Sequence, residues 1–153
     1  MIFTTTTGAG RLVACWGAPA VFMATTINAA AAARVALAQA CDVAVIPAGL
    51  TGNPDFDAQE DRAAAAAVMM AAQALDPDIV PGEGAADFAH WRKRIETEGL
   101  HALFASALHA ENLRKIGFEA DIPFCARLDV TDAVPMGIAR DAFGVLLRPA
   151  QTR

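Results

Sequence analysis

The stretch from residue 42 to residue 70 constrains the fold most, because it predicts a strand, a loop and a helix in immediate succession. Residues 43–46 form an apolar run without alternation, which is typical of a strand buried on both faces of a parallel sheet. Pro47 cannot donate to a β-ladder, so we expect the strand to end there. After a turn-rich loop, an alanine-rich helix is predicted for residues 58–75.

Two acidic residues, Glu60 and Asp61, stand in the first turn of this predicted helix. Asp57 and Glu60 have the spacing of a capping box, in which each side chain accepts a backbone N–H at the start of the helix. Open α/β sheets bind ligands beside the carboxyl ends of their strands, where helix N-termini attract anions. Glu60 and Asp61 are therefore candidates for a site, although acids in a first turn also complement the helix dipole without any further role.

The first half of the chain alternates between strand and helix patterns. Strands are predicted at residues 1–6, 20–24 and 43–46, and helices at residues 11–16, 29–41 and 58–75. The second half predicts helices at residues 85–98, 100–116 and 119–128, then short strands at residues 133–136 and 143–147. Alternation of this kind is typical of βαβ units with right-handed crossovers. The prediction is a single α/β domain over residues 1–153, with a mainly parallel sheet of about four to five strands flanked by helices.

The composition restricts the possible partners. Hydrophobic residues make up 55% of the chain and charged residues only 19%, which excludes a disordered protein and predicts that part of the surface is buried in a homo-oligomer. No window has the ~18 uninterrupted apolar residues of a membrane span. The first residues also lack the basic group of a signal peptide. A net charge of −5 without a basic tract argues against nucleic acid as a partner.

The cysteines indicate a reducing compartment. They are odd in number, far apart and without a CxxC pair: Cys15, Cys41 and Cys125. This pattern predicts buried thiols rather than a disulfide framework or a zinc site, and it suits the cytoplasm.

The histidines lack the spacing of a metal-binding motif. They are His90, His101 and His109. Solvated or capping roles are therefore favoured for all three. Ser106 and His109 lie one helical turn apart, but no nucleophile elbow accompanies them.

Three turns between predicted strands and helices carry the polar groups of a candidate site. In a parallel sheet all three turns emerge at one edge. Backbone N–H groups, hydroxyls and an amide suit phosphate or sulfonate oxygens, and a pair of carboxylates suits magnesium. The candidate residues are Thr6, Gly8, Thr26, Asn28 and Gly49 for the anion, and Glu60 and Asp61 for catalysis and the metal. Asn28 also serves equally well as a simple helix N-cap. Neither a GxGxxG fingerprint nor a P-loop is present.

The order of motifs resembles that of the 2-phosphosulfolactate phosphatase (ComB) family from about residue 5 to residue 135. The motifs are the Thr5-Thr6-x-Gly8 turn, Asn28-Ala29, Ala48-Gly49, Glu60-Asp61, Ser106 with Leu113, Gly117 and Asp121, Phe124-Cys125, and Val134-Pro135. The resemblance implies an α/β fold, dependence on magnesium, and hydrolysis of 2-phosphosulfolactate to sulfolactate in coenzyme M biosynthesis.

Two departures from the family pattern bear on activity. Family members begin with a segment carrying an Asp…Arg-Ala-Thr-Thr motif that this sequence lacks, so the chain is expected to correspond to the C-terminal part of such an enzyme or to a short relative. Where members have Thr-Thr-Asn-Gly-Thr, this chain has Thr-Thr-Thr-Gly-Ala at residues 5–9. An arginine is an obvious partner for phosphate or sulfonate, and the remaining candidates for that role are Arg11, Arg62 and Arg114.

Two hypotheses follow. The first is a magnesium-dependent phosphatase-like hydrolase of small phosphorylated acids, with reduced activity, in which Glu60 and Asp61 hold the metal or orient water. The second is a non-catalytic, oligomeric relative that binds a small phosphorylated or sulfonated acid.

Overall fold

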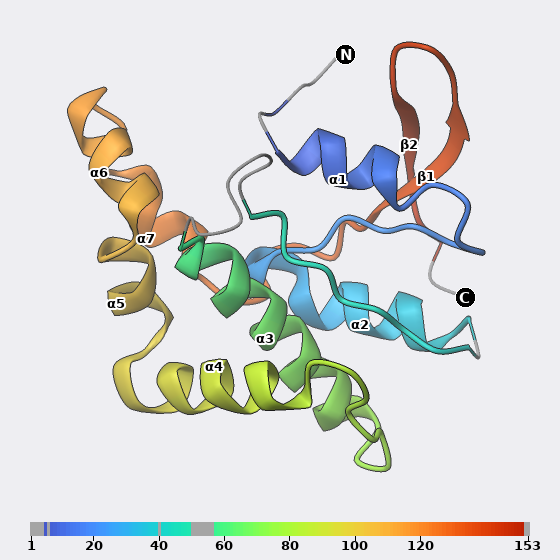
Figure 1. The fold of residues 1–153 in the computed structure, drawn as a ribbon, viewed down its shortest axis with the longest axis horizontal. Coiled ribbons are helices and arrows are strands. Elements are labelled where there is room, and N and C mark those ends of the chain that lie inside the picture. The colour runs from blue at the N-terminus through green and yellow to red at the C-terminus, as the bar shows by residue number, and fades with distance from the viewer. Residues whose placement is uncertain (1–4, 6, 40, 50–56, 152–153) are drawn as a thin grey trace.

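Helices are the main elements of the computed structural model, which describes residues 5, 7–39, 41–49 and 57–151 (Figure 1). The helices are α1 (Gly8–Ala14), α2 (Ala29–Leu37), α3 (Gln59–Leu75), α4 (Ala85–Glu98), α5 (Leu100–Ala105), α6 (Leu108–Lys115) and α7 (Asp121–Cys125). A short 3₁₀ turn, η1 (Thr26–Asn28), directly precedes α2. The strands β1 (Pro135–Arg140) and β2 (Val145–Pro149) form an antiparallel hairpin. Within the described ranges, no helix combines the length and apolarity that crossing a membrane requires.

The helices largely follow the local sequence pattern. Those predicted at residues 58–75 and 85–98 are confirmed as α3 and α4. The helix predicted at residues 100–116 is instead divided into α5 and α6, because Ala107 is extended, with ψ 148°. Ser106, just before this break, donates its hydroxyl to the carbonyl of Ala102 at 2.8 Å, and this bond holds the last turn of α5. The chain can therefore change direction before His109.

The prediction of a mainly parallel sheet is wrong, because the described residues form only one two-stranded antiparallel sheet. Residues 43–46 have no regular secondary structure and join no ladder, and Val43 and Ile46 are 42% and 54% exposed. Residues 21–23 meet β1 only through one isolated bridge, between Phe22 and Met136. A buried parallel strand needs hydrogen-bonded neighbours and apolar cover on both faces, and an apolar composition alone supplies neither. Most of the first predicted strand, residues 1–4 and 6, lies outside the described residues.

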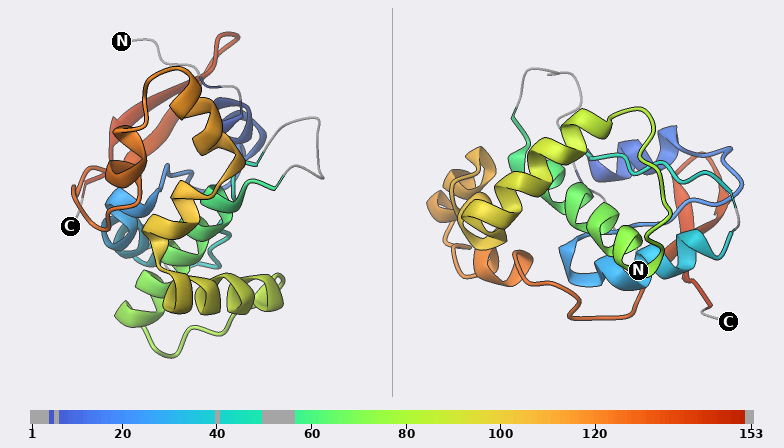
Figure 2. Two further views of the ribbon diagram at one scale, coloured as in Figure 1. Left: turned by 90° about the vertical axis from the view of Figure 1, so that its left-hand side faces the viewer. Right: turned by 90° about the horizontal axis from the view of Figure 1, so that it is seen from below.

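The helices pack around α3, which lies between α2 and α4 (Figure 2). One buried cluster joins α3 to α4 and α5 and consists of Ala63, Ala66, Trp91, Leu100 and Leu103. A second cluster joins α2 to the residue preceding β1 and consists of Ala31, Ala32, Val35 and Val134. Small alanine side chains let the helix backbones approach closely while larger residues fill the remaining space. This packing fixes the first turn of α3 relative to α5 and α6.

Candidate active site

Glu60 lies in the first turn of α3, and its side chain turns toward α6. Its Oε1 atom contacts Nδ1 of His109, 49 residues further along the chain. The other oxygen, Oε2, is buried and has no hydrogen-bond partner among the described residues. A buried carboxylate oxygen without a donor is costly, so this atom is a candidate ligand for a cation or a water molecule.

Asp61 faces the loop ahead of α3. Its Oδ2 atom accepts the backbone N–H of Gly49 at 3.0 Å. Burial, and secondly the charge of Glu60, raise the pKa of Asp61 above its ordinary 3.8, while the Gly49 bond and His109 act in the opposite direction. A carboxylate held partly out of water beside a second carboxylate is a common arrangement in functional sites.

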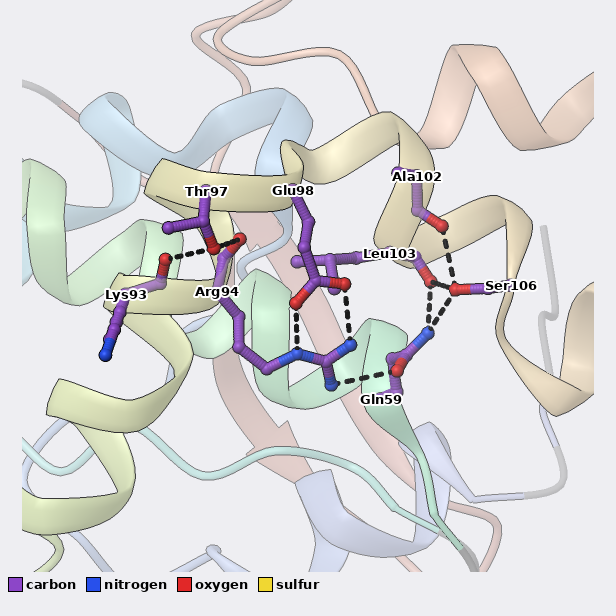
Figure 3. Close-up of polar contacts among 8 residues, drawn as sticks. All are labelled: Gln59, Lys93, Arg94, Thr97, Glu98, Ala102, Leu103 and Ser106. Atoms are coloured by element: carbon purple, nitrogen blue, oxygen red, sulfur yellow. Dashed lines mark hydrogen bonds and ion pairs between the residues drawn. The ribbon is translucent and has the colours of Figure 1, made fainter.

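Gln59, immediately before Glu60, clamps the start of α3 to its neighbours (Figure 3). Its Nε2 donates to the carbonyl of Leu103 at 2.6 Å and to the hydroxyl of Ser106 at 2.8 Å. Its Oε1 accepts from Nη1 of Arg94 at 3.0 Å, and Arg94 in turn makes two bonds to Glu98, of 2.7 and 2.9 Å. Figure 3 shows these residues as one chain of contacts from α4 through α3 to α5. The clamp positions the backbone that carries Glu60 and Asp61.

The predicted capping box of Asp57 and Glu60 is wrong. Ala58 occupies the N-cap position of α3, and no side chain makes a capping hydrogen bond there. Glu60 contacts the imidazole of His109 instead. A side chain that turns toward α6 does not reach back to the start of its own helix, so the tertiary contact replaces the local one.

Two of the residues predicted to bind the anion, Thr26 and Asn28, use their side chains in hydrogen bonds within the protein. Thr26 is 0% exposed and donates its hydroxyl to the carbonyl of Cys125. The side chain of Asn28 accepts the N–H of Thr25 at 2.8 Å and donates to the carbonyl of Ala133 at 2.9 Å. Thr26 therefore joins η1 to the end of α7, and Asn28 joins it to the segment between α7 and β1. Their anion-binding role stays a prediction.

The remaining predicted anion ligands lie on the N-terminal side of the molecule and in the loop ahead of α3. Gly8 begins α1, and a Cβ at this position would approach Oγ1 of Thr5 at 3.0 Å. Gly49 has φ +63°, a left-handed conformation that favours glycine, and its N–H is donated to Asp61. Thr6 lies outside the described residues. The structure thus joins Gly49, Asp61, Glu60 and His109 through consecutive contacts.

Sequence reasoning missed His109, for which it favoured a solvated or capping role. The pairing with Glu60 has no local signal, because the two residues come from different helices. His90 does lie at the surface, with its ring edge-on to Trp91 at 5.4 Å between centroids. Within the described ranges, no group of three or more histidine, cysteine or acidic residues is arranged to hold a metal ion. A metal at this site would therefore depend on few protein ligands.

The cysteines were expected to be buried, and this is wrong for two of them. Cys41 and Cys125 are exposed, and Cys15 is half-buried. Partial burial, followed by the charge of Asp121, raises the pKa of the Cys125 thiol, which disfavours the nucleophilic thiolate. Cys125 is thus a poor candidate for catalysis.

We expect the Asp61→Asn variant to be more stable than the unmutated chain near neutral pH. An acid whose pKa is higher in the folded state binds its proton more tightly when folded. Its stabilising contribution is full below the ordinary pKa of 3.8 and is lost as the pH rises through the raised folded value. Asparagine carries no charge and still accepts the Gly49 N–H. The melting temperatures of Asp61→Asn and of the unmutated chain, measured from acid to neutral pH, should diverge as the pH rises.

The control for this series is Asp78→Asn, at an exposed acid beyond the end of α3. This control should follow the unmutated chain at every pH. If the difference in melting temperature between Asp61→Asn and the unmutated chain does not change with pH, burial does not raise the pKa of Asp61 as described.

Similarity to known proteins covers the whole site. A sequence profile described as 2-phosphosulpholactate phosphatase matches residues 1–138. The chain belongs to the 2-phosphosulpholactate phosphatase family. The matched region includes Gly49, Glu60, Asp61 and His109, and it ends within β1. The resemblance found in the motif order is therefore confirmed.

Two curated members of the 2-phosphosulpholactate phosphatase family are similar to this chain. A probable 2-phosphosulfolactate phosphatase from Gloeobacter violaceus is 33% identical over 150 residues, which cover 97% of this chain and 58% of that protein. A probable 2-phosphosulfolactate phosphatase from Thermus thermophilus is 36% identical over 117 residues, which cover 76% of this chain and 47% of that protein. The chain thus spans about half the length of the curated relatives it matches.

Proposed function

We propose that Glu60, Asp61 and His109 form the centre of a phosphomonoesterase that hydrolyses small phosphorylated acids such as 2-phosphosulfolactate. The observation that carries this proposal is the environment of Glu60. One of its oxygens is held by His109, and the other is buried with no donor among the described residues. Both similar proteins are described as probable 2-phosphosulfolactate phosphatases, which supports this class of substrate.

Magnesium is part of this proposal, and the residues present suit it. The ion prefers oxygen ligands and is usually held by one or two carboxylates together with waters and substrate oxygens. Oε2 of Glu60 is an oxygen of this kind, and Asp61 is the second carboxylate of the site. Bound magnesium would supply charge neutralisation on the phosphoryl oxygens.

The residues of the chain would orient the reactants. Glu60 is positioned by the contact of its Oε1 with Nδ1 of His109, and Asp61 by the hydrogen bond that it accepts from the N–H of Gly49. The two carboxylates are therefore fixed independently. In the reaction, a water oxygen forms a bond to phosphorus as the phosphorus–ester oxygen bond breaks. The proton given up by the water goes to the departing ester oxygen, and the products are inorganic phosphate and the free hydroxy acid. Glu60 would accept a hydrogen bond from the attacking water.

We expect the unmutated chain to release phosphate from 2-phosphosulfolactate and 2-phospholactate only when magnesium is present. Turnover should stay below the enzyme median of about 10 s⁻¹. Phosphoryl transfer needs cations at the transferring oxygens, and no lysine or arginine directly contacts Glu60 or Asp61 among the described residues, so the site would depend on magnesium for most of its positive charge. Phosphate release is measured with magnesium and with a chelator, beside magnesium-dependent shifts in melting temperature.

The matched control is Glu83→Gln, at an exposed acid in the loop before α4, which should behave as the unmutated chain does. Turnover at or above about 10 s⁻¹ would contradict reduced activity. Binding of the phosphorylated acids without any release would favour the second hypothesis, a non-catalytic binding protein.

Self-association and a cytoplasmic location are further parts of the proposal. Large apolar side chains are exposed on the hairpin and on the segment after α6, with Phe143 99%, Leu146 60% and Ile116 66% exposed. Apolar surface of this extent favours a homo-oligomer, and light scattering that found only a monomer at micromolar concentration would contradict this. The cytoplasmic location rests on cysteines that form no disulfide among the described residues.

A further inference from the structure

Arg11, on α1, reaches across the molecule to the loop ahead of α3. Its Nε atom donates to the carbonyl of Ala48 at 2.9 Å, over a separation of 37 residues. A Cβ built on Gly49 would lie 4.0 Å from Nη2 of Arg11, so the guanidinium rests against this glycine. Figure 1 shows α1 beside the end of the segment that leads toward α3. The fold therefore brings a cation from the N-terminal region to the edge of the candidate site.

Gly49 connects this cation to the acidic centre. Its N–H donates to Oδ2 of Asp61 at 3.0 Å, while Arg11 holds the residue before it. Arg11, Gly49, Asp61 and Glu60 consequently follow one another in space. No described carboxylate forms an ion pair with Arg11. Its charge is thus available to an anion from solution.

The other arginines considered as anion ligands have carboxylate partners. Arg62 pairs with Asp87 at 3.2 Å. Arg114 pairs with Glu119 at 3.3 Å and donates to the carbonyl of Ala105 at 2.7 Å. The charges of Arg62 and Arg114 are therefore partly neutralised by acidic neighbours. Arg11 has no such described neighbour, and its bond to Ala48 uses only Nε, so both terminal amino groups are without a partner among the described residues.

We propose that Arg11 binds a tetrahedral oxyanion of the substrate, either its phosphoryl or its sulfonate group, at the site of Glu60 and Asp61. This inference rests on the proposed function. The bond to Ala48 fixes the plane of the guanidinium, so little side-chain freedom is lost when the terminal amino groups pair with two oxygens of the anion. The positive charge also offsets the repulsion between an anionic substrate and the two carboxylates.

We expect Arg11→Gln to weaken binding of inorganic phosphate by about 10- to 100-fold, because hydrogen bonds to charged groups are the strong ones. Arg11→Lys keeps the charge but loses the planar pair of donors, so it should bind with intermediate affinity. Calorimetry with the full chain measures phosphate and sulfoacetate separately, and the anion whose affinity falls identifies the group that Arg11 recognises. Arg148→Gln, at an exposed arginine of β2, is the matched control and should leave both affinities unchanged.

The outcomes separate this inference from the proposed function. If the Arg11→Gln variant loses anion binding and the unmutated chain shows no hydrolysis, the inference is supported and the phosphatase proposal is contradicted. Hydrolysis by Arg11→Gln with an unchanged KM would overturn the inference and leave the phosphatase proposal standing. Failure of the unmutated chain to bind either anion would also overturn the inference. Circular dichroism shows whether each variant is folded. If Arg11→Gln does not fold, the anion affinity of Arg11→Lys tests the inference in its place.

Discussion

Replacing Glu60 with glutamine is expected to reduce phosphate release by about 10²- to 10⁴-fold, the usual contribution of a residue that orients or deprotonates the attacking water. Glutamine keeps the size of the side chain but removes the charge that His109 contacts. The change also removes one of the two carboxylates available to magnesium. We therefore expect the magnesium-dependent rise in melting temperature to disappear together with the activity.

A double-mutant cycle tests whether Glu60 and His109 act as a unit. If they do, Glu60→Gln, His109→Gln and the double variant should lose similar amounts of activity, because the first change already removes the function of the pair. Glu111→Gln, at an exposed acid on the same helix as His109, controls for a general change of charge on α6. Losses that add independently would contradict a coupled pair. Full activity in Glu60→Gln would leave Glu60 with no catalytic role.

The Leu103→Ala variant is expected to lose about 2–5 kcal/mol in the free energy of unfolding, the range found when a large buried side chain is truncated. Leu103 is 0% exposed and lies in the cluster formed with Ala63, Trp91 and Leu100. Its carbonyl also accepts from Gln59, so a cavity here would loosen the clamp at the start of α3. Urea titration followed by circular dichroism measures the loss.

Leu108→Ala provides the comparison, because Leu108 is 49% exposed on the neighbouring helix α6. Its truncation removes little buried surface and should cost far less than that of Leu103. Equal losses at both positions would show that the cluster between α3 and α5 is not the main core of this region.

The helical part of the fold could be predicted because its signals are local. The alanine-rich stretch predicted as residues 58–75 is observed as Gln59–Leu75, since alanine has the highest helix propensity. Gly99, with φ +82°, ends α4 where the sequence indicated. The break at Ser106 and Ala107 was not predictable, because nothing in the side chains nearby forbids a continuous helix.

The sheet could not be predicted for the opposite reason. Val43 and Ile46 have strong β propensity, yet they join no ladder within the described ranges. Strand formation depends on partners that lie elsewhere in the chain, and propensity measures only how well a residue fits a sheet that already exists. The antiparallel pairing of β1 with β2 joins the two short C-terminal segments that were predicted to be strands.

By itself, the sequence determined most of the helices, the family and the position of Glu60 and Asp61 in the first turn of α3, because these depend on residue types and on spacings within a few turns. Only the tertiary structure decided which groups those acids meet. His109 approaches Glu60 from 49 residues away, and Arg11 approaches Ala48 from 37 residues away. Contacts over such separations form when packed helices bring distant segments together, and local sequence patterns do not predict them. The predicted capping box does not form for the same reason, because Glu60 contacts an imidazole on another helix instead of the N–H group at the start of its own.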